Sequence, residues 1–349
     1  MKKKIIRSLL ILAMILVTGL FLQAKSSFLY SDPVMKVEEA NIKVAENMQE
    51  IKGRLLNAPG KVTINETYYE NEGLSPAYQK GEQLILQKHG GKWQVLSLKR
   101  DGYVFILVGI FIWIVLLISG RKGIYALIGL GMNSLLLVLF LWINLNNRSL
   151  PLLFLMSIYT VLAVLIAMGT SYGFKNLDLR KIIGTLLSVF LAFIICLIAM
   201  NQLRDNGIWF EEMQFVTRPY RSVFLAGLLI GAIGASMDNI VTIISSLDEI
   251  QAKNHQLSVK ELVRSGQEIA QDTASSMINV LMFAYLSGAI PSFVFNLANG
   301  WNFSDTFGLH LSLEILRAIC GGFAIVLSVP LALTAFIVAE NLKRRRKAQ

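Results

Sequence analysis

Long apolar segments recur along the chain and limit its fold more than any other feature. A helix needs about 20 residues to cross about 30 Å of hydrocarbon, and each segment has roughly 18 or more mainly apolar residues. The segments lie at residues 5–24, 103–119, 124–143, 151–169, 182–200, 222–246, 272–297 and 313–338. Charged residues make up only 16% of the 349 residues, which excludes an ordinary water-soluble globule. The sequence therefore predicts an α-helical polytopic membrane bundle of about eight transmembrane helices.

Lysine and arginine predict how these helices are oriented, because both residues stay preferentially in cytoplasmic loops. With the N-terminus inside, the cytoplasmic set is Lys2, Lys3, Lys4, Arg7, Arg121, Lys122, Lys175, Arg180, Lys181, Lys253, Lys260, Arg264 and the basic run at 343–347. The short outer loops then hold only Arg148, Arg204, Arg218 and Arg221. Both termini are therefore predicted to be cytoplasmic. The net charge of +10 reflects this asymmetry and contact with the lipid bilayer, and it does not indicate a nucleic-acid partner.

The first segment, residues 1–24, has two interpretations. Its basic start and the "LQA" that ends its apolar run are typical of a secretory signal. The apolar run is long for a cleaved signal, so we favour an uncleaved N-terminal transmembrane anchor. The membrane bundle would then occupy residues 101–338, and residues 339–349 would form a basic cytoplasmic tail.

Residues 25–100 interrupt the apolar pattern and predict a small extracytoplasmic β-rich domain between helices 1 and 2. Segments of β-favouring residues lie at 51–57, 61–69, 82–88 and 93–99, separated by turn residues that include Asn71 to Gly73. The run from His89 to Lys92 predicts a tight hairpin. We expect a small barrel or sandwich of the SH3-like or OB-like kind, docked on the bundle because a domain of this size is barely stable alone.

The later part of the bundle carries helix-start and kink signals. Ser258 followed by Glu261 is typical of a capping box, so a helix is predicted to begin there and to continue into the segment at 272–297. Pro291 and Pro330 fall inside predicted spans and are expected to kink them.

Two of the predicted helices carry polar stripes, because residues three or four apart share one face of a helix. The first stripe holds Gly231, Gly234, Ala235, Asp238, Thr242, Ser245, Ser246 and Glu249, and the second holds Glu268, Asp272, Ser275, Ser276 and Asn279. Close helix packing explains the glycines and serines. It does not explain Asp238, since an Asp at the centre of a membrane helix costs about 2.5–3.5 kcal/mol without a packing benefit.

Asp238 is therefore the leading candidate for a functional residue. Antiparallel neighbouring helices can bring Asp238 and Asp272 to similar depths, which predicts a water-accessible path for a proton, a cation or a substrate. Its candidate residues are Asp238, Asn239, Thr242, Ser246, Glu249, Asp272, Ser276 and Asn279. The alternative for Asp238 is a permanently protonated side chain bonded to Asn279 or a serine. The alternative for Asp272 is an interfacial carboxylate that complements a helix dipole.

Other polar residues of the apolar segments have simpler interpretations. Glu314 and Arg317 are three residues apart and predict either a local ion pair or an outer gate. His310 is expected to be solvated in an outer loop. Asn133 is expected to form a hydrogen bond between helices.

The sequence lacks the motifs of several enzyme classes. It contains no GxxxxGK[ST], no HExxH and no GxSxG, so neither a nucleotide nor a metal cofactor is predicted. Cys196 and Cys320 both fall within predicted spans and are expected to be small packing residues. Two intramembrane Asp residues are also found in aspartyl proteases, but "SMD" and "AQD" do not match the YD and GxGD contexts of that class. No enzyme activity is therefore predicted.

Two stretches carry a resemblance to a known family. "GAIGASMDNIVTIISSLDEI" at 231–250 and "SGQEIAQDTASSMINVLMFAYLSGAIP" at 265–291 resemble the YibE/F family of bacterial multi-pass membrane proteins. The resemblance singles out Gly231, Asp238, Ser246, Glu249, Gly266, Asp272, Met277, Asn279 and Tyr285. It implies a multi-pass protein of the bacterial cytoplasmic membrane and assigns no biochemical activity.

The sequence supports two functional hypotheses. The first is a secondary permease for an unknown small solute or ion, coupled to a proton or cation through Asp238 and Asp272, with kinks at Pro291 and Pro330 that assist alternating access. The second is a receptor or assembly partner that does not transport and whose outer domain binds an envelope component. A homo-oligomer or a complex with another membrane protein is compatible with both hypotheses.

Overall fold

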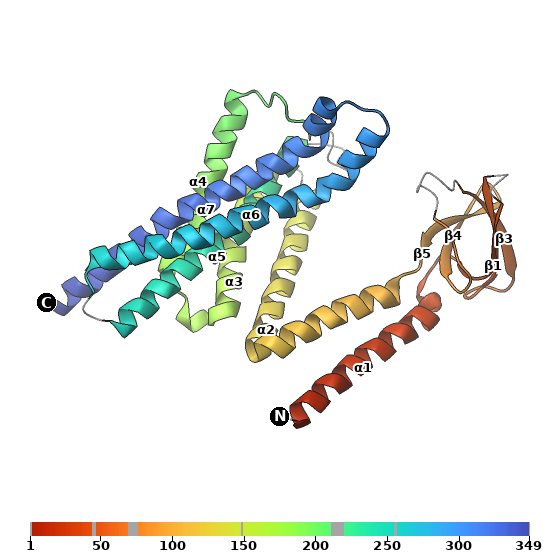
Figure 1. The fold of residues 1–349 in the computed structure, drawn as a ribbon, viewed down its shortest axis with the longest axis horizontal. Coiled ribbons are helices and arrows are strands. Elements are labelled where there is room, and N and C mark those ends of the chain that lie inside the picture. The colour runs from red at the N-terminus through yellow and green to blue at the C-terminus, as the bar shows by residue number, and fades with distance from the viewer. Residues whose placement is uncertain are drawn as a thin grey trace. The chain divides into compact units, whose positions relative to one another are not determined.

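The structure is a computed structural model that describes residues 2–43, 47–68, 76–147, 149–210, 220–254 and 257–348. It divides into two compact units, residues 1–124 and 125–349 (Figure 1). The predicted turn at Asn71 to Gly73 and the outer-loop residues Arg148 and Arg218 lie outside the described residues.

The first unit contains a five-stranded antiparallel sheet whose strand order is β3-β2-β1-β4-β5. The strands are β1 (Val34–Lys43), β2 (Met48–Leu55), β3 (Lys61–Thr67), β4 (Gln83–His89) and β5 (Lys92–Leu98). Strands β2 to β5 match the predicted segments, whereas β1 was not predicted. Strand β1 pairs with both β2 and β4, so it joins the two halves of the sheet.

Alternating burial along the strands builds the core of this sheet. In β2 and β3, the buried residues include Ile51, Val62 and Ile64, and they pack with Met35 of β1 and Leu84 of β4. This alternation is expected for strands with one face on a core and one face in water. The apolar side chains of one face of the small sheet therefore pack together in a core.

The predicted hairpin between β4 and β5 is confirmed. His89 pairs with Lys92, which leaves Gly90 and Gly91 as a two-residue turn. Both glycines have positive φ, 58° and 84°, as a type I′ turn requires. Residues with a Cβ adopt this conformation at a cost, so the Gly90-Gly91 pair fixes the register of the two strands.

Lys99 connects the sheet to the two helices of the first unit, α1 (Lys2–Lys25) and the beginning of α2 (Asp101–Asn146). Its buried ammonium donates to the carbonyl oxygens of Leu22 and Gln23 at 3.3 and 2.8 Å and lies 3.5 Å from the carboxylate of Asp101. The Gln23 amide donates in turn to the Lys99 carbonyl oxygen at 2.8 Å. The last turn of α1 is thus bonded to the segment that precedes α2.

Helix α2 contains two of the predicted membrane segments. The segments predicted at 103–119 and 124–143 belong to this single 46-residue element, which is interrupted at Gly120 by the non-helical angles φ 54° and ψ −127°. A straight helix of this length would measure about 70 Å, more than twice the hydrocarbon thickness of a bilayer. Among the described residues, seven helical elements are long and apolar enough to cross a membrane, where the sequence predicted about eight, and the difference is the joining of these two segments in α2.

The second unit contains the end of α2 and five further helices. These are α3 (Leu152–Tyr172), α4 (Leu179–Gln202), α5 (Tyr220–Lys253), α6 (Val259–Ala298) and α7 (Phe303–Ala348). The capping box of Ser258 and Glu261 is confirmed at the start of α6. Helix α7 continues through the residues predicted as a tail at 339–349 and ends at Ala348.

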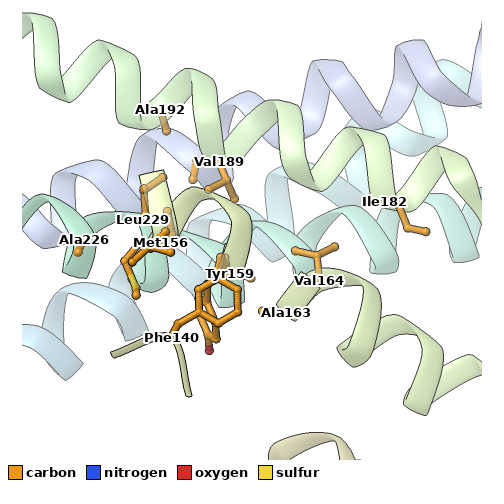
Figure 2. Close-up of a cluster of buried hydrophobic side chains, with 14 of the residues drawn as sticks. Phe140, Met156, Tyr159, Ala163, Val164, Ile182, Val189, Ala192, Ala226 and Leu229 are labelled. Carbon is orange, nitrogen blue, oxygen red and sulfur yellow. The ribbon is translucent and has the colours of Figure 1, made fainter. Parts of the chain in front are cut away.

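Helix α5 lies at the centre of the second unit and packs against α3, α4, α6 and α7. Figure 2 shows part of the apolar core, in which Ala226 and Leu229 of α5 meet Met156 and Tyr159 of α3. The ring of Tyr159 lies edge-on to Phe140, with 6.1 Å between centroids. This core fixes the position of α5, the helix that contains Asp238.

Candidate functional site

A buried polar cluster joins α5, α6 and α7. The Asn239 side-chain nitrogen donates to the Ser328 hydroxyl at 2.7 Å and to the Ile325 carbonyl oxygen at 3.2 Å, both in α7. The Asn239 side-chain oxygen accepts a hydrogen bond from the Thr273 hydroxyl of α6 at 3.0 Å. Asn239 and Ser328 are both fully buried. A buried amide with three partners fixes the rotation of α5 about its axis, because turning the helix would break all three bonds.

Asp238, the next residue, lies on a different face of α5 and is exposed on the surface of the chain. Its carboxylate is close enough to Tyr172, at the end of α3, to interact with it electrostatically. Thr242, one turn further along α5, donates to the Asp238 carbonyl oxygen at 2.8 Å and so does not bond the carboxylate. The structure therefore separates Asp238 from Asn239, which the sequence had placed in one pocket.

Helix α4 contributes a buried lysine, Lys181, near this region. The sequence predicted Lys181 only as a basic residue of a cytoplasmic loop. The Lys181 ammonium donates to the Ser245 hydroxyl of α5 at 2.7 Å and lies 4.8 Å above the ring of Tyr172. Lys181 is buried despite its charge. Tyr172 thus contacts a buried cation and also interacts electrostatically with the Asp238 carboxylate. Sequence reasoning missed Tyr172 as a site residue, although its position at the end of a predicted span is a usable signal.

Arg180 forms a second charged group beside Lys181. Its guanidinium bridges Asp178, the N-cap of α4, and Asp248 of α5, with shortest distances of 2.7 Å to each carboxylate. Bidentate bonds of this kind are among the strongest hydrogen bonds between side chains. An ion-pair network therefore holds the beginning of α4 against the last turns of α5.

The charges in this region do not balance. Arg180 pairs with two carboxylates, and Lys181 has a hydroxyl and an aromatic ring as neighbours. Asp238 adds a third carboxylate, which forms no ion pair within the described part of the chain. The group as a whole therefore carries one more acid than base, and Asp238 is the acid without a basic partner.

Asp178 makes the second unit sensitive to acid. Burial alone would raise the pKa of Asp178, but its hydrogen bonds and charge interaction with Arg180 outweigh burial and hold the pKa below its ordinary value of 3.8. A carboxyl with a depressed folded-state pKa stabilises the fold above its unfolded pKa, and this stability is lost as the pH falls through the folded pKa. We expect the unfolding temperature of the wild type to drop below about pH 4.

The Asp178→Asn variant tests this expectation, because an amide cannot titrate. Its unfolding temperature should be lower than that of the wild type at pH 7 and should change less between pH 5 and pH 3, measured in one detergent at constant ionic strength. Equal acid sensitivity of the two proteins would show that Asp178 does not contribute.

The predicted site residues of α6 lie on its exposed surface. Asp272, Ser276 and Asn279 are exposed, whereas Thr273 faces Asn239. No contact described by the structure joins Asp238 to Asp272. Of the other predicted residues, Ser246 is half-buried and Glu249 pairs at the surface with Lys253 at 2.8 Å. The predicted path is thus divided between a charged group on α3, α4 and α5 and an exposed polar face on α6.

Several other predictions can be compared with the structure. Glu314 and Arg317 form the local ion pair that was one of the two interpretations. His310 is buried and bonds to Asn296 at 2.6 Å, so the prediction of a solvated loop residue is wrong. Its position inside α7, rather than in a loop, is the physical reason. Asn133 donates to the Ala163 carbonyl oxygen at 3.5 Å, which confirms a bond between helices.

Two glycines of the family-like stretches have packing roles. A Cβ on Gly231 would collide with the hydroxyl oxygen of Tyr285 on α6, and a Cβ on Gly266 would lie 2.6 Å from Leu333 on α7. Cys196 and Cys320 are both buried free thiols, as expected for packing residues. Among the described residues, no group of three or more His, Cys, Asp or Glu is arranged to hold a metal ion.

Seven long apolar helices, five of them packed as one unit around buried polar contacts, define a polytopic helical membrane protein. The sequence profile described as YibE/F-like protein matches residues 107–344. The chain therefore belongs to the YibE/F family. Searches of curated proteins and of solved structures gave no match.

Proposed function

We propose that the protein is a secondary permease of the bacterial cytoplasmic membrane, coupled to a proton or a cation through Asp238. The observation that carries the proposal is the unpaired carboxylate of Asp238, on a helix long and apolar enough to cross a membrane and close to Tyr172, whose ring contacts the buried Lys181. Ionisable residues within membrane segments are rare and mark ion or proton paths. A carboxylate without a basic partner is the group that binds a proton or a cation from solution.

The orientation predicted from the basic residues gives this path a direction. Both termini are cytoplasmic in the proposal, residues 25–100 are extracytoplasmic, and the ion-pair network of Arg180 lies at the cytoplasmic end of α4 and α5. Ser245, the partner of Lys181, follows Asp238 by about two helical turns, or roughly 10 Å. Asp238 therefore lies deeper in the membrane than Lys181. A proton or cation from the cytoplasm would pass Lys181 and Tyr172 to reach it.

Lys181 has a role in this arrangement that a neutral residue would not have. Its positive charge near the path repels cations, so a cation already bound at Asp238 would not be joined readily by a second one. Binding of a proton or a cation to Asp238 neutralises the charge of its carboxylate. The electrostatic state of α3, α4 and α5 thus differs between loaded and empty protein, which is the difference that coupling requires.

The test is transport by the full-length protein in proteoliposomes. An imposed proton or sodium gradient should drive uptake from a panel of small solutes, and Asp238→Asn should abolish the dependence on the gradient. Glu268→Gln is the matched control, because Glu268 is an exposed carboxylate of α6 whose described partner is Arg264. Gradient-driven uptake that persists in Asp238→Asn, or that is lost equally in Glu268→Gln, would refute the role of Asp238.

One observation favours assembly as a second candidate function. The most apolar window of α6 has no residue buried within the chain, and the exposed face carries Asp272, Ser276 and Asn279. Polar residues that face lipid are costly and are normally covered by another helix. If wild-type protein shows no gradient-driven uptake of any solute while it purifies with a second membrane chain on α6, assembly is the better account.

A further inference from the structure

A cavity of about 640 Å³ lies in the first unit, where the sheet ends and α2 begins. Its polar wall includes Tyr30, Ser97, Arg100 and Asp101, and its apolar wall includes Val104, Phe105 and Val108 from the first two turns of α2. These three apolar side chains are all exposed. The cavity therefore has one end at the sheet and the other along a helix that is long and apolar enough to cross a membrane.

The charges around the cavity leave Arg100 without a partner. Asp101 is compensated by Lys99 at 3.5 Å and accepts hydrogen bonds from Ser26 and Tyr30. Burial, followed by the hydrogen bond to Asp101 and its charge, raises the pKa of Tyr30 to about 12, so its hydroxyl remains a donor near neutral pH. Arg100 is exposed, and its guanidinium forms no ion pair within the described residues. The polar end of the cavity therefore has one uncompensated positive charge.

We infer that this cavity binds one anionic phospholipid, with the phosphate at Arg100 and an acyl chain along Val104, Phe105 and Val108. The Arg100 guanidinium has free donors for a phosphate, and its positive charge attracts the anionic headgroup. The apolar wall begins within one helical turn of Arg100, a separation that suits a molecule with an anionic head and an apolar tail. The site is independent of Asp238 and of the proposed transport.

Native mass spectrometry of the full-length protein in detergent micelles with defined lipids tests the headgroup. The wild type should retain phosphatidylglycerol in preference to phosphatidylcholine, and Arg100→Gln should weaken phosphatidylglycerol binding about tenfold, as expected for loss of a charge-assisted bond. Lys92→Gln is the matched control, since Lys92 is an exposed cation of the same sheet outside the cavity. Arg100→Lys keeps the charge and should retain most of the preference.

A second pair of variants tests the acyl chain. Val108→Trp fills the apolar half of the cavity and should weaken phosphatidylglycerol binding, whereas Leu107→Trp adds the same bulk at an adjacent exposed position that does not line the cavity. Glycerol 3-phosphate, which has the headgroup chemistry without the tail, should not displace the lipid at equal concentration.

Three results would overturn the inference. The first is unchanged phosphatidylglycerol binding in Arg100→Gln, and the second is an equal loss in Lys92→Gln, which would indicate only a general effect of basic charge. The third is displacement by glycerol 3-phosphate at equal concentration, which would identify a site for free phosphate esters. Binding by Arg100→Lys close to the wild-type level shows that a loss in Arg100→Gln does not come from misfolding.

Discussion

The Lys99→Met variant is expected to lose about 3 kcal/mol of local stability in the first unit, because removing one partner of a buried charged group strands the others. Methionine keeps the length and the apolar stem of lysine. The carbonyl oxygens of Leu22 and Gln23 would nevertheless lose their buried donor, and Asp101 would lose its nearest cation. The last turn of α1 should therefore separate from the segment that precedes α2.

Hydrogen exchange is the measurement that isolates this effect, since it reports local opening separately from global unfolding. Amides from residue 26 to residue 36 should exchange faster in Lys99→Met than in the wild type. Lys92→Met makes the same chemical change at an exposed position and should alter stability by no more than about 0.5 kcal/mol. Similar exchange in the two variants would show that the buried ammonium contributes little.

The second large effect is expected at Gly102, where α1 and α2 are in close contact. A Cβ at this position would collide with the carbonyl oxygen of Gly19 and would lie 2.7 Å from the backbone nitrogen of Gln23. Backbone atoms cannot rotate away as a side chain can, so Gly102→Leu should cost about 3 kcal/mol or force the two helices apart. Loss of the close approach would also pull Gln23 from its bond to the Gly102 nitrogen at 3.1 Å.

Gly131→Leu is the control for this prediction. Gly131 lies on the same helix, is exposed and would place its Cβ in open space. The unfolding temperature in detergent should fall markedly for Gly102→Leu and should change little for Gly131→Leu. A similar unfolding temperature for both variants would mean that the α1–α2 contact is not needed for stability.

Periodicity and turn chemistry predicted the strands from β2 to β5, but they could not predict β1. The register of β1 shifts between Val37 and Glu39, and this irregularity breaks the alternation of buried and exposed residues that marks a strand. Glu38, Glu39 and Asn41 also have low β-propensity. Pairing with β2 and β4 decides the conformation of β1, and that pairing depends on residues distant in sequence.

The sequence identified Asp238 as a candidate residue, but it did not predict how the side chains around the site are arranged in space. The carboxylate of Asp238 is recognisable because it interrupts an apolar helix. Helix rotation, however, is set by packing: Thr273 faces α5, while Asp272, one position earlier and about 100° around the helix, does not. Lys181 was missed for a related reason, since a basic residue at the start of a span normally lies in water, and only the packing of α4 on α5 buries it.

Within the described part of the chain, β1 is the only strand that pairs with both ribbons of the sheet. On one side it bonds the β2–β3 ribbon, and on the other it bonds the β4–β5 hairpin. An isolated hairpin is marginally stable in water, so neither ribbon is expected to persist alone. During synthesis, β1 can therefore pair with β4 only after the ribosome has added Gln83 to Ile85. The sheet is complete only when β5 has been made, a few residues before α2 begins.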